Sequence, residues 1–259
     1  MLLTGAEALD LDGPLAHYRA HGWAPLGRVA SPEALEALRR RADQLMLGEV
    51  VQPGLFFQHD AATGRYEDIP RGQGWQGPSL RYRKLEKLEL DPLFSSWIGN
   101  LLFGRIAHAV VGPEVALCRA VLFTKAAHGG TDLPWHQDAG DFWGLDRDPR
   151  LQIWTALDDA PAEAGCLEII PGTHQGGRAT PEGGVIPDEL VARSGTLGRS
   201  ILAPARAGEA LLIHNHVWHR SGRNATGATR RGLTICLMDA ATRCTRRRSP
   251  RRFPRVYGP

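Results

Sequence analysis

Residues 134–138 read Pro-Trp-His-Gln-Asp and close an apolar segment that begins at Leu133. Because His136 and Asp138 are two residues apart, an extended backbone turns both side chains to the same face. A histidine from a distant strand would complete a set of two imidazoles and one carboxylate. That set is the facial triad of non-haem Fe(II) oxygenases, which leaves coordination positions open for other ligands. The stretch therefore indicates a metal site at the end of a β-strand.

Short apolar segments separated by Gly, Pro and Asp surround this stretch from Val115 onward, and such spacing is typical of an antiparallel sandwich or barrel. We expect strands at Val115–Thr124, Leu133–Asp138, Gln152–Leu157, Cys166–Ile170, Ser200–Ala203, Ala210–His214 and Gly232–Met238. Residues 171–199 are rich in Pro and Gly and predict a long loop with a short helix at about 188–192. Long loops on a rigid β-core often act as lids.

Helical patterns dominate the first third of the chain. Ser31-Pro32-Glu33 offers an N-cap, a proline at the first helical position and an early acid. Apolar residues then recur at helical spacing up to Leu45. A second helical stretch is expected from about Asp91 to Val111, and irregular covering structure over 48–80. We predict a single domain over 1–259: a helical part at about 1–112, a β-core at about 113–240 and a basic tail at 243–259.

Composition bounds the class of protein. The 259 residues are 42% hydrophobic and 23% charged, which is ordinary for a globular chain. No apolar run approaches the roughly 20 residues that span a bilayer, and the first residues lack a signal-peptide pattern. We therefore expect a cytoplasmic protein with no membrane partner, either a monomer or a homodimer. Four cysteines without CxxC spacing (Cys118, Cys166, Cys236 and Cys244) are interpreted as free thiols, three of them buried.

The charge is unevenly distributed along the chain. Residues 243–259 hold seven arginines and no acid, so subtracting seven from the net charge of +3 leaves −4 for the rest. Such a tail could bind a nucleic acid or an anionic substrate. No aromatic-interleaved basic surface or nucleic-acid motif accompanies it, so no nucleic-acid partner is expected. We interpret the tail as a solvated segment partly anchored by Phe253, Val256 and Tyr257.

A second cluster offers the third metal ligand. His214, His216 and His219 lie within six residues, and alternation along a strand puts His214 and His216 on one face. Arg230 and Arg231 follow, and on a strand they point to opposite faces, so only one can enter the metal pocket. An arginine there could hold the far carboxylate of a keto-acid cosubstrate. Residue patterns alone leave the histidine and the arginine open.

With these motifs in view, the chain resembles the phytanoyl-CoA dioxygenase family of Fe(II)- and 2-oxoglutarate-dependent oxygenases. The resemblance covers roughly residues 80–240 and also includes residues 14–46. The matching segments stand in the family's order and spacing: WHQD at 135–138, WTALDD at 154–159, GCLEIIPGTH at 165–174, GEALLIHNHVWHRSGRN at 208–224 and the arginines at 230–231.

The resemblance implies a double-stranded β-helix, or jelly roll, with N-terminal helices packed on one side. It implies Fe(II) held by His136, Asp138 and His219, with His216 as the alternative third ligand. It also implies 2-oxoglutarate and O2 as cosubstrates, the 2-oxoglutarate C5 carboxylate being held by Ser221 and Arg230. The resemblance implies two further residues at the cosubstrate site, Trp154 and Lys84.

Resemblance and residues together predict an oxidoreductase that hydroxylates or otherwise oxidises an unactivated C–H bond of a small molecule, with release of succinate and CO2. Related halogenases have a small residue in place of the carboxylate, so Asp138 favours hydroxylation. We expect residues 55–58, Phe142, Trp143 and the 171–199 segment to contact the substrate and determine specificity. The family's bacterial members act on varied small molecules, and the sequence holds no signature for coenzyme A.

Two alternative functions remain at this stage. One is a cupin-like, metal-dependent enzyme that does not use 2-oxoglutarate, which Ser221 and Arg230 disfavour. The other is a non-catalytic module that binds a metal or ligand, with a basic tail that recruits an acidic partner. Succinate production from 2-oxoglutarate would separate the first of these from the dioxygenase.

Overall fold

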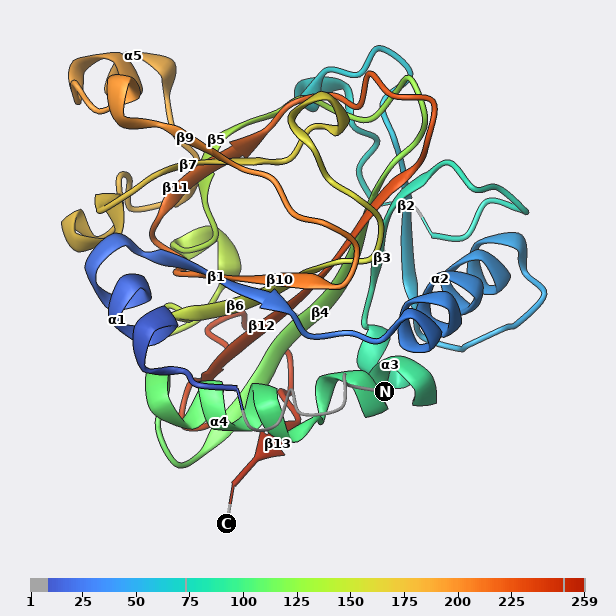
Figure 1. Cartoon of the computed structure of the whole chain (residues 1–259), viewed down its shortest axis with the longest axis horizontal. Helices are drawn as coiled ribbons and strands as arrows, with labels where there is room; N and C mark the ends of the chain where they lie inside the picture. Colours follow the sequence, from blue (N-terminus) through green and yellow to red (C-terminus); the bar gives the residue numbers. More distant parts are fainter. Residues whose placement is uncertain (1–8, 73, 249, 259) are drawn as a thin grey trace.

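Two antiparallel β-sheets form the core of the protein (Figure 1). The computed structural model describes residues 9–72, 74–248 and 250–258. The larger sheet has the strand order β1-β10-β6-β12-β4-β3-β2, with β13 also paired to β4, and the smaller has the order β8-β5-β11-β7-β9. Neighbours in each sheet are mostly distant in sequence, as in a double-stranded β-helix, so the predicted jelly roll is confirmed.

The larger sheet comprises β1 (Trp23–Arg28), β2 (Phe56–His59), β3 (Tyr82–Glu86), β4 (Val115–Lys125), β6 (Leu151–Ala156), β10 (Glu209–Ile213), β12 (Arg230–Asp239) and β13 (Arg255–Tyr257). The smaller comprises β5 (Leu133–Gln137), β7 (Leu167–Ile170), β8 (Gly184–Val185), β9 (Ile201–Ala203) and β11 (Trp218–Ser221). The α-helices are α1 (Asp12–His21), α2 (Pro32–Leu47), α3 (Pro92–Ile98), α4 (Leu101–Val110) and α5 (Asp188–Arg193).

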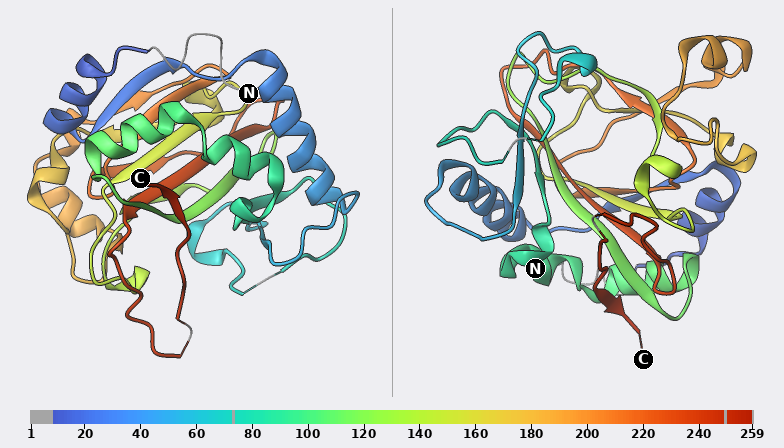
Figure 2. Two further views of the ribbon diagram at one scale, coloured as in Figure 1. Left: turned by 90° about the horizontal axis from the view of Figure 1, so that it is seen from below. Right: turned by 180° about the vertical axis from the view of Figure 1, so that it is seen from behind.

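Helices α1 to α4 cover the outer face of the larger sheet, as predicted (Figure 2). Helix α2 begins where the sequence indicates, because the Ser31 side chain accepts a hydrogen bond from the Ala34 amide at 3.2 Å. Its apolar face, including the fully buried Leu38, enters the largest hydrophobic cluster together with α3, α4 and the sheet. This packing leaves the other face of the sheet free to line the space between the two sheets.

The N-terminal part is less helical than the sequence indicated. It supplies three strands, β1, β2 and β3, which form the two edges of the larger sheet. Strand β1 tolerates Pro25 because it is an edge strand, paired only with β10. The predicted helix from Asp91 to Val111 is two helices, because Asn100 caps α4 by accepting a hydrogen bond from the Phe103 amide at 2.9 Å.

The segment at 171–199 and the basic tail both fold onto the sheets. The predicted short helix is α5, and β8 pairs with β5 at His136 and Gln137. The tail returns along β4, where the Leu117 amide donates to the Pro254 carbonyl at 2.9 Å and β13 pairs with the start of the strand. All four cysteines are free thiols, three of them buried. Among the described residues, no helix has the length and apolarity needed to cross a bilayer.

Candidate metal centre

Strands β5 and β11 bring two of the predicted ligands face to face. His136 on β5 and His219 on β11 are direct cross-strand partners, and Asp138 follows immediately after β5. The potential ligand atoms of these three residues lie within 4.8 Å of one another, and the His219 Nε2 is 3.6 Å from the Asp138 Oδ2. Among the described residues, no other group of three or more His, Cys, Asp or Glu side chains is arranged to hold a metal ion.

Both imidazoles are held in the tautomer that a metal needs. The Nδ1 of His136 lies 2.9 Å from the Pro134 carbonyl, and the Nδ1 of His219 lies 3.0 Å from the Val217 carbonyl. Because a carbonyl can only accept, each Nδ1 carries the proton and each Nε2 presents a lone pair. Burial, with His219 nearby, lowers the pKa of His136 to about 4, so the ring is neutral at pH 7.

Asp138 is held as a carboxylate by neighbours on the larger sheet. The Arg119 guanidinium lies 3.1 Å from its Oδ1, and the Gln152 amide donates to its Oδ2 at 2.8 Å. Burial alone would favour the neutral acid, but the Arg119 guanidinium holds the pKa of Asp138 well below its usual range. Arg119 is itself stacked over the Trp143 ring at 4.1 Å. The three ligand candidates thus combine two imidazoles that present Nε2 lone pairs with one anion.

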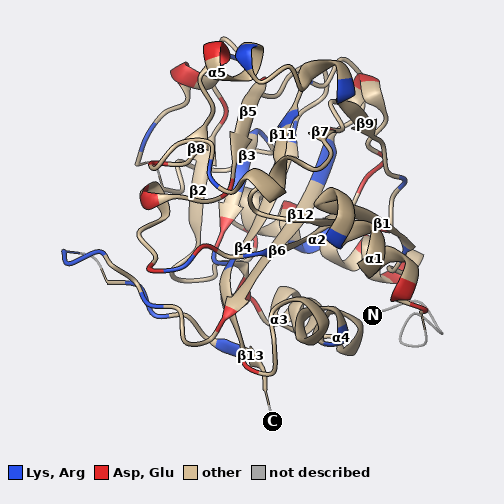
Figure 3. Ribbon diagram, turned by 90° about the vertical axis from the view of Figure 1, so that its left-hand side faces the viewer, with Lys and Arg blue, Asp and Glu red and all other residues tan. Residues whose placement is uncertain are grey.

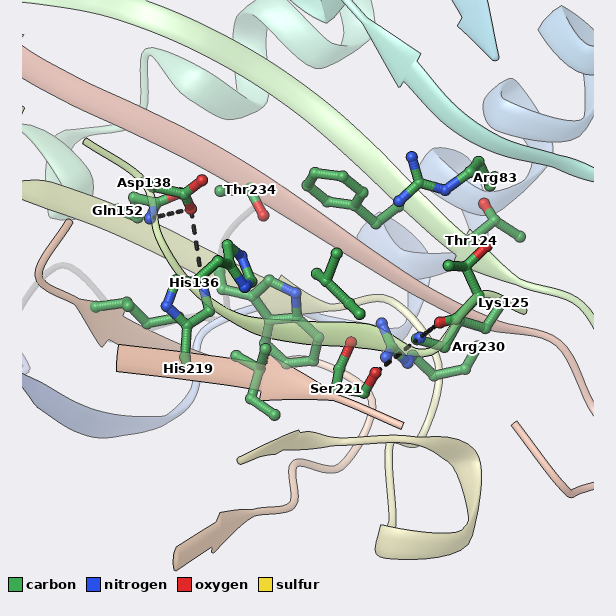
Figure 4. A pocket seen from close by; sticks show the side chains of 16 residues that line it. Arg83, Thr124, Lys125, His136, Asp138, Gln152, His219, Ser221, Arg230 and Thr234 are labelled. Atoms are coloured by element: carbon green, nitrogen blue, oxygen red, sulfur yellow. Dashed lines mark hydrogen bonds and ion pairs between the residues drawn. The ribbon is translucent and has the colours of Figure 1, made fainter. Parts of the chain in front are cut away.

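Two buried cations lie at the other end of the same cavity (Figure 4). Arg230, only 3% exposed, donates to the carbonyls of Ala164 and Gly165. Lys125 donates from Nζ to the Thr131 carbonyl at 2.5 Å and the Ser221 carbonyl at 3.3 Å. No salt bridge among the described residues includes Arg230 or Lys125.

Burial determines the electrostatics at this basic end. It lowers the pKa of Arg230 to about 10, and burial together with Arg230 lowers the pKa of Lys125 well below its ordinary value. Two desolvated cations without a carboxylate are costly unless a ligand supplies the anion. The cavity therefore suits a ligand with a carboxylate at this end and metal-binding oxygens at the other.

The remaining predicted cosubstrate residues are distributed unevenly around this cavity. Ser221 and Trp154 both line it, and the Trp154 ring lies 6.0 Å from the Arg230 guanidinium carbon. Lys84 does not line it: its Nζ forms an ion pair with Glu86 and it lines the adjoining outer cavity. Its neighbour Arg83 lines both cavities, at a point where the pairing of β3 with β2 shifts register.

The rival residues have other partners. His216 donates toward Asp148, with 2.9 Å between Nε2 and Oδ2, and the His214 ring packs beside it. Arg231 leaves the opposite face of β12 and forms ion pairs with Asp43 and Asp158. Of the competing histidines and arginines that the residue patterns left undecided, only His219 and Arg230 line the cavity.

Sequence reasoning missed Lys125, Arg119 and Gln152, although one signal was present. Arg119 and Gln152 are polar side chains within apolar segments predicted to be strands, and Lys125 directly follows the first of these segments. Such side chains are rarely buried without a partner, so they could have been nominated as cavity-lining residues. What each one contacts depends on strand pairing, which the sequence did not reveal.

Comparison with known proteins agrees with this geometry. The model of the phytanoyl-CoA dioxygenase (PhyH) family matches residues 18–232. The chain belongs to the phytanoyl-CoA dioxygenase family. It is therefore a non-haem iron enzyme that depends on 2-oxoglutarate and O2, and the family predicted from the motifs is confirmed.

Individual relatives match to different extents. Phytanoyl-CoA dioxygenase domain-containing protein 1 of Danio rerio is 31% identical over 88% of this chain and 90% of its own length. For the Bos taurus protein of that name, the match is 30% identical and covers 59% of this chain and 55% of that protein. L-proline trans-4-hydroxylase of Streptomyces griseoviridis is 32% identical over 53% of this chain and 59% of its own length. The matched region thus spans little more than half of the last two proteins.

Solved structures show the same fold at lower identity. The epimerase SnoN, solved in complex with Fe3+, alpha ketoglutarate and nogalamycin RO, superposes with a TM-score of 0.73. That match covers 95% of this chain and 98% of SnoN at 18% identity. The phytanoyl-CoA dioxygenase family fold is thus shared almost end to end.

Proposed function

We propose that the protein hydroxylates a C–H bond of a small molecule, using Fe(II) held by His136, Asp138 and His219 and 2-oxoglutarate anchored by Arg230 and Ser221. The observation that supports this assignment is a single cavity with a neutral-histidine and carboxylate cluster at one end and two unpaired buried cations at the other. A dicarboxylate keto acid matches both ends.

Each side chain has a task in this scheme. Iron together with 2-oxoglutarate and O2 supplies the oxidising power for an unactivated C–H bond, and the cosubstrate leaves as succinate and CO2. Arg230 suits the C5 carboxylate because its planar guanidinium can make paired, charge-assisted hydrogen bonds. Lys125 adds a second cation beside it, and Ser221 lines the same end. Arg119 and Gln152 fix the orientation of the Asp138 carboxylate.

The carboxylate of Asp138 also bears on the reaction outcome. A side chain that occupies this coordination position leaves no room for a halide there, so we assign oxygen transfer rather than halogenation. Incorporation of chloride into the substrate by the unmodified protein would contradict this assignment.

The basic end of the cavity argues against the two alternative functions. A metal-dependent enzyme without 2-oxoglutarate would have no use for two desolvated cations facing its metal ligands. A non-catalytic module has no need of two imidazoles with fixed tautomers at one end of a substrate-sized cavity. Both arguments favour the dioxygenase.

The test is succinate formation together with metal affinity. The purified protein with Fe(II), 2-oxoglutarate and O2 should release succinate slowly even without substrate. His219→Gln should lower metal affinity by at least about tenfold, as loss of a ligand does, whereas His216→Gln, the matched control in the same cluster, should retain it. Arg230→Met should keep metal affinity and lose 2-oxoglutarate affinity. Equal metal affinity in the two histidine variants would overturn the ligand assignment.

A further inference from the structure

A continuous path leads from the metal-ligand cluster to the basic C-terminal segment. His136 and Asp138 line the inner cavity and also an outer cavity on its other side. The outer cavity shares Lys84, Arg119 and Trp143 with a third cavity, whose far wall is Arg246 and residues 250–254. The candidate metal ligands therefore lie between the cosubstrate end and an open channel that ends at arginines.

The C-terminal segment is attached to the loop that directly follows Asp138. The Thr245 amide donates to the Gly144 carbonyl at 2.9 Å. The Arg246 guanidinium donates to the Phe142 carbonyl and the Arg251 guanidinium to the Trp143 carbonyl, each at 2.6 Å. These contacts hold two guanidinium groups at the channel mouth, against the short loop that carries the aromatic side chains of Phe142 and Trp143.

The arginines at this mouth lack negative partners. Among the described residues, no carboxylate lies within ion-pair distance of Arg246 or Arg251, and their guanidinium groups donate to carbonyl oxygens. Of the two acids that line the third cavity, Glu86 is paired with Lys84 and Arg119, and Glu89 forms no salt bridge among the described residues. Six lysines and arginines line the same cavity: Lys84, Lys87, Arg119, Arg246, Arg251 and Arg252. Figure 3 shows the basic residues along this projecting segment. The mouth thus carries positive charge that the protein does not neutralise.

Apolar surface lies between the arginines and the metal ligands. The Phe142 side chain is 73% exposed at the mouth, although large aromatic side chains usually bury most of their area. Phe56, Trp143 and Phe253 line the same cavity. An apolar molecule that reaches inward past these rings would have one end near Asp138 and the other beside the arginines.

We propose that the C-terminal segment forms the outer wall of the substrate channel, and that Arg246 and Arg251 bind the anionic end of an elongated apolar substrate. The anion is a carboxylate or a phosphate, because planar guanidinium groups pair with the oxygens of either. The oxidised carbon lies at the opposite end, near the metal ligands. This inference rests on the proposed function, which supplies the reaction, and adds the substrate class and the residues that select it.

The test measures binding of defined probes. Decyl phosphate, decanoate and the neutral decan-1-ol are titrated calorimetrically into the full chain loaded with Fe(II) and 2-oxoglutarate without oxygen. The variant Arg246→Ala/Arg251→Ala should weaken anion binding by at least about tenfold, equivalent to about 1.4 kcal/mol. Binding of decan-1-ol should stay within about twofold, since its contacts are apolar. The relative affinities of the two anions identify which oxyanion the site prefers.

The matched control is Arg247→Ala/Arg248→Ala. It removes the same charge from the same segment, at two exposed arginines that line none of the three cavities. Equal weakening in both double variants would show a general charge effect and overturn the proposal, as would an unmodified protein that binds neither anion. Binding of 2-oxoglutarate is measured in every sample: its absence would refute the proposed function, whereas its presence without probe binding would refute only this inference.

Discussion

Lys125 is a buried side chain with no carboxylate within ion-pair distance among the described residues. Its Nζ donates to two backbone carbonyls, and the nearby Arg230 raises the cost of its charge. A bound 2-oxoglutarate carboxylate would supply the missing negative partner and offset the repulsion from Arg230. The charge of Lys125 should therefore contribute to cosubstrate affinity. Lys125→Met should therefore weaken 2-oxoglutarate binding by about tenfold or more, on the order of 1.4 kcal/mol.

The measurement is a 2-oxoglutarate titration under anaerobic conditions, with Lys84→Met as the control. Lys84 lies outside the inner cavity and pairs with Glu86, so its loss should change the dissociation constant by less than about threefold. If Lys84→Met weakened binding more than Lys125→Met, the family resemblance would have identified the correct lysine and the geometric assignment would be wrong.

Gly232 fixes the position of the Trp154 ring. A Cβ at residue 232 would lie 2.4 Å from the Trp154 Nε1 and about as close to two ring carbons, so the buried indole would have to move. Gly232→Ala should cost about 1–3 kcal/mol of unfolding free energy, as overpacking does, and weaken 2-oxoglutarate binding. Gly198→Ala, where a Cβ meets no atom within 4 Å, should leave both unchanged. Denaturant titration and calorimetry provide the two readouts, and an unaltered cosubstrate affinity in Gly232→Ala would contradict a role for Trp154.

At the scale of elements, one carboxylate helps to attach the segment at 171–199 to the turn that follows β5. Asp148 accepts from the Arg178 Nε at 2.5 Å, from the Gly140 amide at 3.0 Å and from His216. Arg178→Ala should loosen the segment and accelerate amide hydrogen exchange at residues 177–185 and 139–142. Arg193→Ala, an exposed residue of α5, is the matched control. Unchanged exchange in Arg178→Ala would show that the other contacts, namely pairing of β8 with β5 and the hydrogen bonds of Gln137 with Gly177 and Ala179, are enough to hold the segment.

The sequence predicted elements well where the signal was local. The apolar segments of β4, β6 and β10 and the Ser31 cap of α2 lie within a residue or two of their predicted positions. Strand β11 was missed because its four residues include a histidine, an arginine and a serine, so its pattern is not that of an apolar strand. Pairing of Lys125 with Ser221, or of Arg119 with Asp138, depends on contacts between distant strands, which no local pattern encodes.

For the molecule as a whole, half-buried histidines with lowered pKa values make stability depend on acidity. Burial, with His216 and His174 nearby, lowers the pKa of His214 to about 3, and burial lowers the pKa of His174. In the unfolded chain these rings take up protons near pH 6.5. Between that value and about pH 3 the unfolded state therefore binds more protons, so unfolding free energy is lost as the pH falls.

The melting temperature of the metal-free protein should accordingly decrease steadily from pH 7 to pH 4.5. His214→Gln removes one of these proton-binding sites, so its melting temperature should fall less over the same interval, even if it is lower at pH 7. His128→Gln is the control, because that ring is exposed and its loss should leave the slope unchanged. Thermal unfolding followed by circular dichroism gives the slopes, and parallel curves for His214→Gln and the unmodified protein would exclude His214 as a source of the acid sensitivity.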